Sequence, residues 1–339
     1  IIIIIIIIII IIIVTELSVE GRVNKLVRRW APLVWLAPGE RFFPSSVNEF
    51  LHHVTPWHLR SQHTHNSVMP QGSASESWFL VTNSSIDELI GNKTSFIYGQ
   101  DPSLVRVPVY ALITLCDVKS SSFYVTYWMF YPYSQGKAVC TLDMGILGAW
   151  PMPLVNGRCF GFPREFGGHI GDWEHVSMSF QGNSSRPDAI YVSAHNAGAL
   201  YRRNRDGHRY NLELQEVRRG SALQVPTFPA SLRLTTGEQR PELFAALGSH
   251  GLWTAPGVHR YVRIPRLYDH SGYGVPWRTW TEVHLLYEDS SEPDWMQYRG
   301  RWGNPRSRCH PLANTICEIF DGPTGIPMKK HHFQCANTS

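Results

Sequence analysis

The chain has 339 residues, of which 43% are hydrophobic and 17% charged, and its formal net charge is +4. This composition provides a substantial core for one large domain or two small ones and argues against a disordered chain. The small charge is spread along the sequence, and no zinc-finger, helix-turn-helix or RNA-binding pattern occurs, so we expect no nucleic-acid partner. Short β-branched and aromatic runs among 23 prolines and 27 glycines predict a mostly β protein.

Residues 1–30 form an N-terminal segment of unusual composition. Residues 1–13 are all isoleucine, and with Val14 they are too short for a membrane span, which needs about 20 residues. A short amphipathic helix is predicted over 15–30, so the segment is a candidate membrane anchor, or a docking segment in a larger assembly. The basic residues in it would favour the cytosolic side of a membrane, which conflicts with a lumenal remainder. They are Arg22, Lys25, Arg28 and Arg29.

Residues 31–305 are predicted to form one β-sandwich domain with a few short helices and long loops. A helix is expected near 46–51, with Ser45 or Ser46 as its N-cap. Residues 54–77 are rich in His, Ser and Gln without periodicity, which predicts an exposed loop. The expected strands are 31–36, 105–116, 123–133, 176–180, 189–194 and 281–287, with a short helix or strand at 241–247.

Cysteines and glycosylation sequons indicate the compartment. Six cysteines without a C-x-x-C pair favour disulfides over a zinc ribbon or a thioredoxin-like site. With four N-x-[ST] sequons, they predict a secreted or lumenal glycoprotein with a cysteine-containing tail over 306–339. The disulfide candidates are Cys116, Cys140, Cys159, Cys309, Cys317 and Cys335, in no determined pairing, and the sequons are at Asn83, Asn92, Asn183 and Asn337.

The densest group of chemically active residues is Gly168–His175, with the sequence GHIGDWEH. In a strand that includes Asp172, alternation places Asp172 and Glu174 on one face with the apolar Val176. Two carboxylates facing a core need positive compensation, and this octet contains no Lys or Arg. A divalent cation held by His169, Asp172 and Glu174 would supply it. The alternative is a structural ion pair, for which Arg164 is close in sequence.

Three further histidines are candidates for the same pocket. His175 ends the octet, and His195 and His250 each follow a predicted strand or short helix and have a glycine nearby. If they face the carboxylates, their imidazoles would favour Zn²⁺ or Mn²⁺, whereas the carboxylates alone favour Ca²⁺ or Mg²⁺. Each lone histidine is equally well interpreted as a hydrogen-bonded residue at a strand end.

Several stretches together resemble the Vps62-type (vacuolar protein sorting 62-like) family, in the expected order over roughly residues 31–305. The resemblance implies no defined biochemical activity. The matching stretches are Ala37–Ser46, Tyr127–Lys137, Gly168–His175, Val192–His195, Leu247–His250 and Gly300–Asn304.

A more distant resemblance concerns the core of the octet. The pattern H-x-x-D-W-E is similar to that of the necrosis- and ethylene-inducing toxin-like proteins, which are secreted β-sandwiches that hold a divalent cation in a cavity and engage glycosylated sphingolipids. The similarity implies His169, Asp172 and Glu174 as ligands. That family also uses an aspartate after an aromatic strand, where this chain has Tyr133-Ser134-Gln135 and no carboxylate.

Three functions fit these observations. The preferred hypothesis is a non-catalytic, extracytoplasmic β-sandwich that binds a protein partner or a glycan or lipid headgroup, with help from a bound cation. The second is a metal-dependent hydrolase that uses His175 or His250 as a proton shuttle, although no nucleophile motif such as Gly-x-Ser-x-Gly is present. The third is a structural subunit of a membrane-associated or extracellular assembly.

Overall fold

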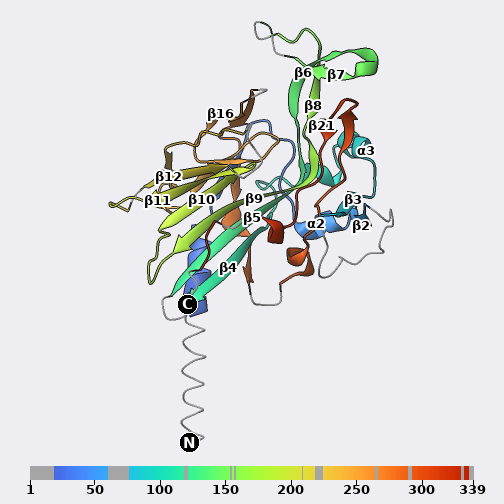
Figure 1. Cartoon of the computed structure of the whole chain (residues 1–339). Helices are drawn as coiled ribbons and strands as arrows, with labels where there is room; N and C mark the ends of the chain where they lie inside the picture. Colours follow the sequence, from blue (N-terminus) through green and yellow to red (C-terminus); the bar gives the residue numbers. More distant parts are fainter. Residues whose placement is uncertain are drawn as a thin grey trace, which may run out of the picture.

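The computed structural model describes residues 19–59, 76–117, 121–152, 155, 158–207, 209–217, 224–263, 266–288, 292–329 and 332–335. This part of the chain is mostly β with short helices and long loops, as the composition predicted (Figure 1). No helix within it is long and apolar enough to cross a membrane. The all-isoleucine segment, and with it the predicted anchor, lies outside the described residues.

An eight-stranded sheet forms the centre of the molecule. Its strands are antiparallel except for the edge pair β19 and β4, which is parallel. Burial on both faces explains why β5 carries aromatic residues on both sides rather than an alternating pattern. In spatial order the strands are β13 (Ser231–Leu232), β12 (Tyr210–Val217), β11 (Ala197–Arg203), β10 (Ala189–Ala194), β9 (His169–Phe180), β5 (Ser122–Ser134), β4 (Val109–Asp117) and β19 (Val283–Tyr287).

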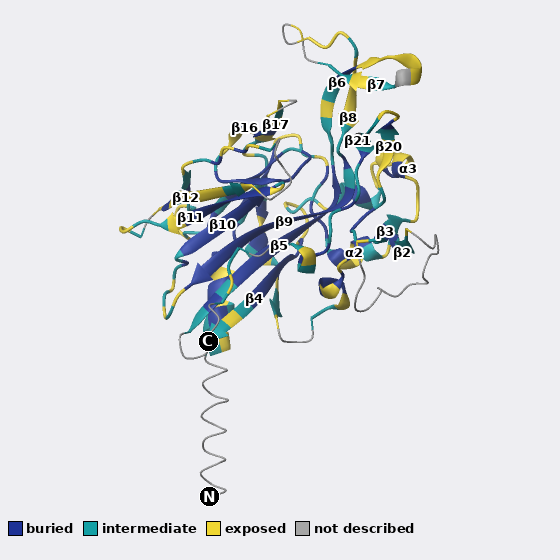
Figure 2. Cartoon of the chain, in the orientation of Figure 1, coloured by how far each residue is buried: buried dark blue, intermediate teal, exposed yellow. Residues whose placement is uncertain are grey.

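A smaller sheet and the N-terminal helix cover one face of this sheet, which confirms the predicted sandwich. Residues 19–30 are helical and bury Val23, Val27 and Trp30 in the same core as Val34 of the small sheet. Figure 2 shows the central strands as the most continuous buried region. In order, the small sheet contains β15 (Leu252–Trp253), β14 (Glu242–Ala245), β1 (Leu33–Leu36) and β18 (Val275–Arg278).

Short helices and an aromatic core cover the opposite face. Ser46 is the N-cap of α2 and accepts a hydrogen bond from the Glu49 amide, as expected. Trp302 packs edge-to-face on Trp173, with ring centroids 5.2 Å apart. The elements on this side are α2 (Val47–Leu51), β2 (Val54–His58), β3 (Trp78–Thr82), α3 (Ile86–Gly91), η1 (Phe96–Tyr98), η4 (Asp294–Gln297) and η5 (Ile326–Met328).

The predicted exposed loop is partly wrong at its start. Residues 54–58 form β2 and pair with β3, so the apolar Val54 and Leu80 belong to the core of this face. Residues 60–75, which contain His63 and His65, lie outside the described residues. The cross-strand partner lies beyond those residues, and local composition could not reveal it.

Three hairpin-like units project from the body. The largest contains β6 (Lys137–Asp143), η2 (Gly145–Leu147), β7 (Ala149–Pro151) and β8 (Phe162–Phe166), and it stands clear of the body in Figure 1. The other two are β16 (Gly257–Val262) with β17 (Leu267–Ser271), and β20 (Ser307–His310) with β21 (Ala313–Ile319). A short helical turn, η3 (Thr279–Thr281), precedes β19.

All six cysteines form disulfides, which confirms the cysteine prediction and indicates an oxidising compartment. The pairs are Cys116–Cys335, Cys140–Cys159 and Cys309–Cys317. The tail is thus stapled both within itself and to β4. The sequon residues Asn83, Asn92 and Asn183 are exposed, whereas Asn337 lies outside the described residues; their glycosylation and the division at residues 30 and 305 stay predictions.

A substitution at Gly171 tests how closely the backbone of the octet packs against the backbone of Trp302. Its φ is +67°, and a Cβ atom there would lie 2.0 Å from the carbonyl oxygen of Trp302. We expect Gly171→Ala to lower the free energy of unfolding by roughly 3 kcal/mol, because backbone strain and a backbone clash act together. Gly91→Ala, where a Cβ meets nothing within 4 Å, is the matched control. Equal denaturant midpoints for the two variants would contradict this close packing.

Candidate functional site

The octet lies in β9, at the middle of the central sheet. Asp172 is opposite Tyr131 of β5, and Glu174 is opposite Met129, so both carboxylates lie on the side of the core shared with the small sheet. The alternation breaks at Gly171, whose φ is +67°, and Ile170 and Trp173 both belong to the opposite core. A strand is therefore what presents the two acids together.

Asp172 is buried and held in its ionised form. Its Oδ1 accepts a hydrogen bond from the Trp173 amide (2.9 Å), and its Oδ2 lies 3.5 Å from Nδ1 of His250. Burial by itself would raise the pKa of Asp172, but the contact with His250 and the charge of His169 outweigh it and lower the pKa. Asp172 is thus the anionic member of the pair.

Glu174 is its protonated counterpart. Burial, followed by the nearby charge of Asp172, raises the pKa of Glu174 well above its usual range. Its Oε2 accepts a hydrogen bond from the hydroxyl of Ser193 at 3.0 Å. Two adjacent carboxyls in a dry environment do not readily ionise together, so one retains a proton.

His250 connects the acid pair to the Ala37–Ser46 stretch. It is fully buried, its ring stacks on Tyr131 with centroids 3.9 Å apart, and its Nε2 is 2.9 Å from the carbonyl oxygen of Phe42. Glu40 approaches from the same side, with Oε2 3.8 Å from that Nε2. Residue 250 also has φ of +58°, an unusual conformation for histidine that the surrounding contacts maintain.

A positive group that the octet itself lacks comes from the tail. Lys329 donates a hydrogen bond from Nζ to the carbonyl oxygen of Trp173 at 3.2 Å. The positive charge of Lys329 acts against the desolvation that raises the pKa of both acids, although the pKa of Glu174 stays raised. The sequence argument considered only nearby residues, such as Arg164, which instead pairs with Asp143 and Glu318 on the surface. A lysine 155 positions away carried no local signal.

The other candidate histidines lie in three different places relative to the acid pair. His169 lines the same cavity as the acids, and its Nδ1 is 2.7 Å from the carbonyl oxygen of Gly171; burial lowers its pKa. His175 is buried on the opposite side of β9, tilted against Trp128, and does not reach the cavity. His195 lines the cavity but belongs to a second cluster.

That second cluster surrounds Asp269 of β17, a residue that sequence reasoning missed. Asp269 is fully buried. Its carboxylate oxygens lie within hydrogen-bond distance of donor atoms of Lys137 (2.9 Å), Ser249 (2.7 Å), His195 (2.7 Å) and Trp253 (3.1 Å). Burial alone would raise the pKa of Asp269, but His195 and then Lys137 lower it below its usual range.

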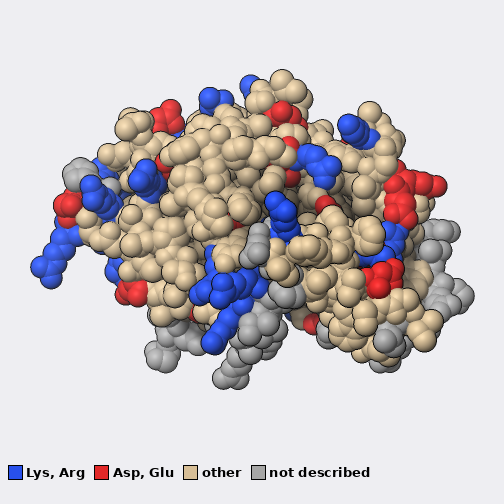
Figure 3. All heavy atoms as spheres, turned by 90° about the horizontal axis from the view of Figure 1, so that it is seen from above, with Lys and Arg blue, Asp and Glu red and all other residues tan. Residues whose placement is uncertain are grey.

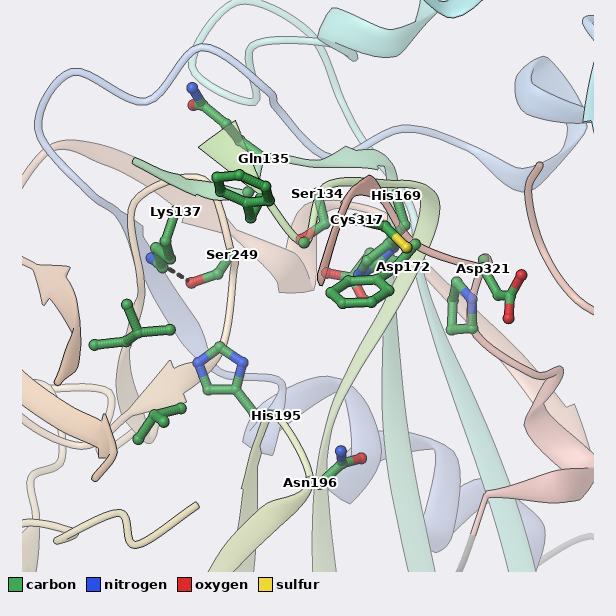
Figure 4. Close-up of a pocket in the computed structure, with 18 of the residues that line it drawn as sticks. Ser134, Gln135, Lys137, His169, Asp172, His195, Asn196, Ser249, Cys317 and Asp321 are labelled. Atoms are coloured by element: carbon green, nitrogen blue, oxygen red, sulfur yellow. Dashed lines mark hydrogen bonds between the residues drawn. The ribbon is translucent and has the colours of Figure 1, made fainter. Parts of the chain in front are cut away.

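One cavity of about 690 Å³ connects the two clusters. Figure 4 shows Lys137, Ser249 and His195 on one side of it and His169 and Asp172 on the other. Tyr261 and Phe320 add aromatic surface to the lining. The volume is in the range of small-molecule sites, and it combines apolar walls with a few charged groups.

The candidate metal ligands are close together without forming a complete cage. In the part of the chain that the structure describes, no group of three or more His, Cys, Asp or Glu side chains is arranged to hold a metal ion. The hydroxyl of Tyr131 is buried and has no hydrogen-bond partner among the described residues. A bound polar group could supply that missing partner. Metal binding by His169, Asp172 and Glu174 stays a prediction.

The stretches that carried the family resemblance meet at this cavity. Gly248 donates its amide to Glu40 (2.8 Å), and its carbonyl oxygen accepts from the Gln135 amide (2.7 Å). Trp302 and Gly303 pack directly on the backbone of the octet. The family profile described as "Vacuolar protein sorting-associated protein 62" matches residues 14–205. The chain belongs to the Vps62 family. This agrees with the resemblance inferred from the sequence.

Two curated yeast proteins are similar to this Vps62-family chain over most of its length. A putative vacuolar protein sorting-associated protein, TDA6, of Saccharomyces cerevisiae is 22% identical, with 93% of this chain and 68% of the relative covered. Vacuolar protein sorting-associated protein 62 of the same yeast is 21% identical, with 91% and 66% covered. The chain spans about two thirds of the length of these relatives. No solved structure matches significantly.

The Asp269 cluster predicts a pH-dependent contribution to stability. Because the folded-state pKa of Asp269 lies below its unfolded value, the stabilisation is present at neutral pH and is lost as the pH falls through and below about 4. Asp269→Asn should lower the free energy of unfolding at pH 7 by about 3 kcal/mol and flatten its decline in acid. Urea titrations from pH 7 to 3 measure both effects. The exposed Asp294→Asn is the control, and a parallel decline in all three proteins would refute the assignment.

Proposed function

We propose that this Vps62-family protein is a non-catalytic, extracytoplasmic binding protein whose cavity takes a polar glycan or lipid headgroup. The supporting observation is the 690 Å³ cavity, which places buried acids at one end and Lys137 with His195 at the other. Carboxylates accept hydrogen bonds from hydroxyl groups, and aromatic rings pack on sugar faces. The three disulfides support an extracytoplasmic location.

A divalent cation at Asp172 and Glu174, with His169 as third ligand, is part of the proposal. Oxygen-rich donors favour Ca²⁺ or Mg²⁺ over Zn²⁺ or Mn²⁺. The raised pKa of Glu174 marks a place where added positive charge is favourable, since such a charge would displace the proton. A bound cation would supply a Lewis-acidic contact for ligand oxygens, while the surrounding residues fix its ligands in place.

The cluster around Asp269 supports binding over hydrolysis. Ser249 donates its hydroxyl to Asp269 and accepts a hydrogen bond from Lys137 at 3.0 Å, so the serine bridges two charged groups. His195 contacts Asp269 rather than the serine oxygen, so these residues do not form a nucleophile–base pair. His175, a proposed proton shuttle for the hydrolase alternative, lies on the far side of β9.

The double variant Asp172→Asn with Glu174→Gln tests the cation. Wild-type protein should melt at a higher temperature with millimolar Ca²⁺ or Mg²⁺ than with EDTA, and more so at pH 8 than at pH 5.5, because binding releases the Glu174 proton. The variant should lose that difference. Differential scanning calorimetry in EDTA and in each of Ca²⁺, Mg²⁺, Mn²⁺ and Zn²⁺ makes the comparison.

The matched control carries the same charge change on the exposed residues Asp294→Asn and Glu288→Gln. It should respond to cations like the wild type. Identical wild-type melting temperatures in EDTA and in all four metals would show that the acid pair is a structural feature without an ion.

A further inference from the structure

The arm formed by β6, β7 and β8 carries an unusual amount of exposed apolar surface. Figure 1 shows it standing clear of the body, and the Cys140–Cys159 disulfide joins β6 to the segment that precedes β8. Of the twenty large apolar side chains exposed in the described part of the chain, seven lie between Leu142 and Phe162. Monomeric soluble proteins seldom gather such residues without a use.

We define the apolar tip by these residues and one neighbour. Ile146 is 96% exposed, Phe160 69% and Phe162 70%. The neighbour is Leu312 at the turn of the β20–β21 hairpin, which is held beside the arm because Trp150 packs on His310 with ring centroids 4.3 Å apart. The apolar tip contains Leu142, Met144, Ile146, Trp150, Val155, Phe160, Phe162 and Leu312.

The stretch around Ile146 carries no charge. Residues 144–157, with the sequence MGILGAWPMPLVNG, contain no Asp, Glu, Lys, Arg or His, whereas Asp143 and Arg158 flank them. Figure 3, which looks down on this end of the molecule, shows basic and acidic side chains dispersed among uncharged surface. A segment of this kind can enter an apolar phase without the large cost of desolvating a charge.

The way exposed residues are distributed over the arm favours a lipid bilayer over a folded protein as the partner of the apolar tip. Successive strand residues point to opposite faces, and Phe162 to Glu165 of β8 are all exposed, so both faces of β8 meet solvent. A folded partner would cover one face and leave the other in water, whereas lipid surrounds a projecting tip on every side. Tryptophan and phenylalanine are also the side chains expected at a membrane interface.

The arm is also continuous with the cavity. Lys137 at the start of β6, Val139, Pro151 and Phe166 at the end of β8 all line it. We propose that the apolar tip inserts into the outer part of a lipid bilayer. Resting on the function proposed above, we further assign to the cavity the headgroup of a lipid in that same bilayer. The bilayer is thereby chosen over a soluble glycan as the source of the ligand.

Co-sedimentation of the full chain with sucrose-loaded phosphatidylcholine vesicles tests the insertion. Ile146→Ser with Phe162→Ser should weaken partitioning by about a hundredfold, roughly tenfold for each exposed side chain that no longer enters the bilayer. Both side chains are solvent-exposed, so the variant should keep the wild-type melting temperature. Leu104→Ser with Leu214→Ser, which removes exposed apolar groups from the body, is the control and should bind like the wild type.

Each other outcome counts against insertion. Wild-type protein that stays in the supernatant, or a tip variant that sediments like the wild type, overturns it. If light scattering shows a wild-type dimer that the tip variant dissociates, and vesicles do not bind, the apolar tip is an interface between copies of this chain.

The acid-pair variant separates this proposal from the cavity function. Asp172→Asn with Glu174→Gln should still bind phosphatidylcholine vesicles while losing the cation response, and the tip variant should show the reverse. Loss of vesicle binding in the tip variant, with no cation response in the wild type, would leave insertion standing and remove the cation from the proposed function.

Discussion

The contact between Asp172 and His250 is the constraint on which the site depends. It places an ionised carboxylate inside a sandwich core, where charge is tolerated only next to compensating groups. His250 provides that compensation, and it is itself fixed by Phe42, Tyr131 and Glu40. Once one acid is held as an anion, its neighbour Glu174 must keep a proton or acquire a cation. The chemistry of this end of the cavity follows from the difference in pKa between the two adjacent carboxyls.

A second buried carboxylate, that of Asp269, lies at the other end of the cavity, and it is compensated differently. Asp269 is more deeply buried than either octet acid, yet four donors surround it. The octet pair has fewer donors, since Asp172 is contacted by the Trp173 amide and His250, and Glu174 by the Ser193 hydroxyl. The proposed cation would therefore bind at the end of the cavity that holds Asp172 and Glu174. This asymmetry favours ligand orientation over non-specific ion binding.

The sequence predicted the elements of the fold better than the partners in the site. Strands such as 189–194 were identified because β-branched and aromatic runs report burial on a sheet, and Ser46 because an N-cap is a local signal. Lys329 and Asp269 were missed because a long-range pairing leaves no trace in nearby composition. His175 was wrongly grouped with the pocket candidates, since one position along β9 reverses the face.

The Cys116–Cys335 bond spans 219 residues and encloses the octet, the arm and the tail within one covalent ring. Lys329 lies six positions before its closing cysteine, so this ammonium group is tethered near β4 even if the last turns of the chain detach. Re-docking would then be intramolecular, with a high effective concentration. In a reducing environment that tether is cut, and the position of Lys329 would rest on the packing of η5, whose Ile326 is buried in the aromatic core. The oxidation state of one distant bond thus sets how firmly the cavity keeps its charge balance.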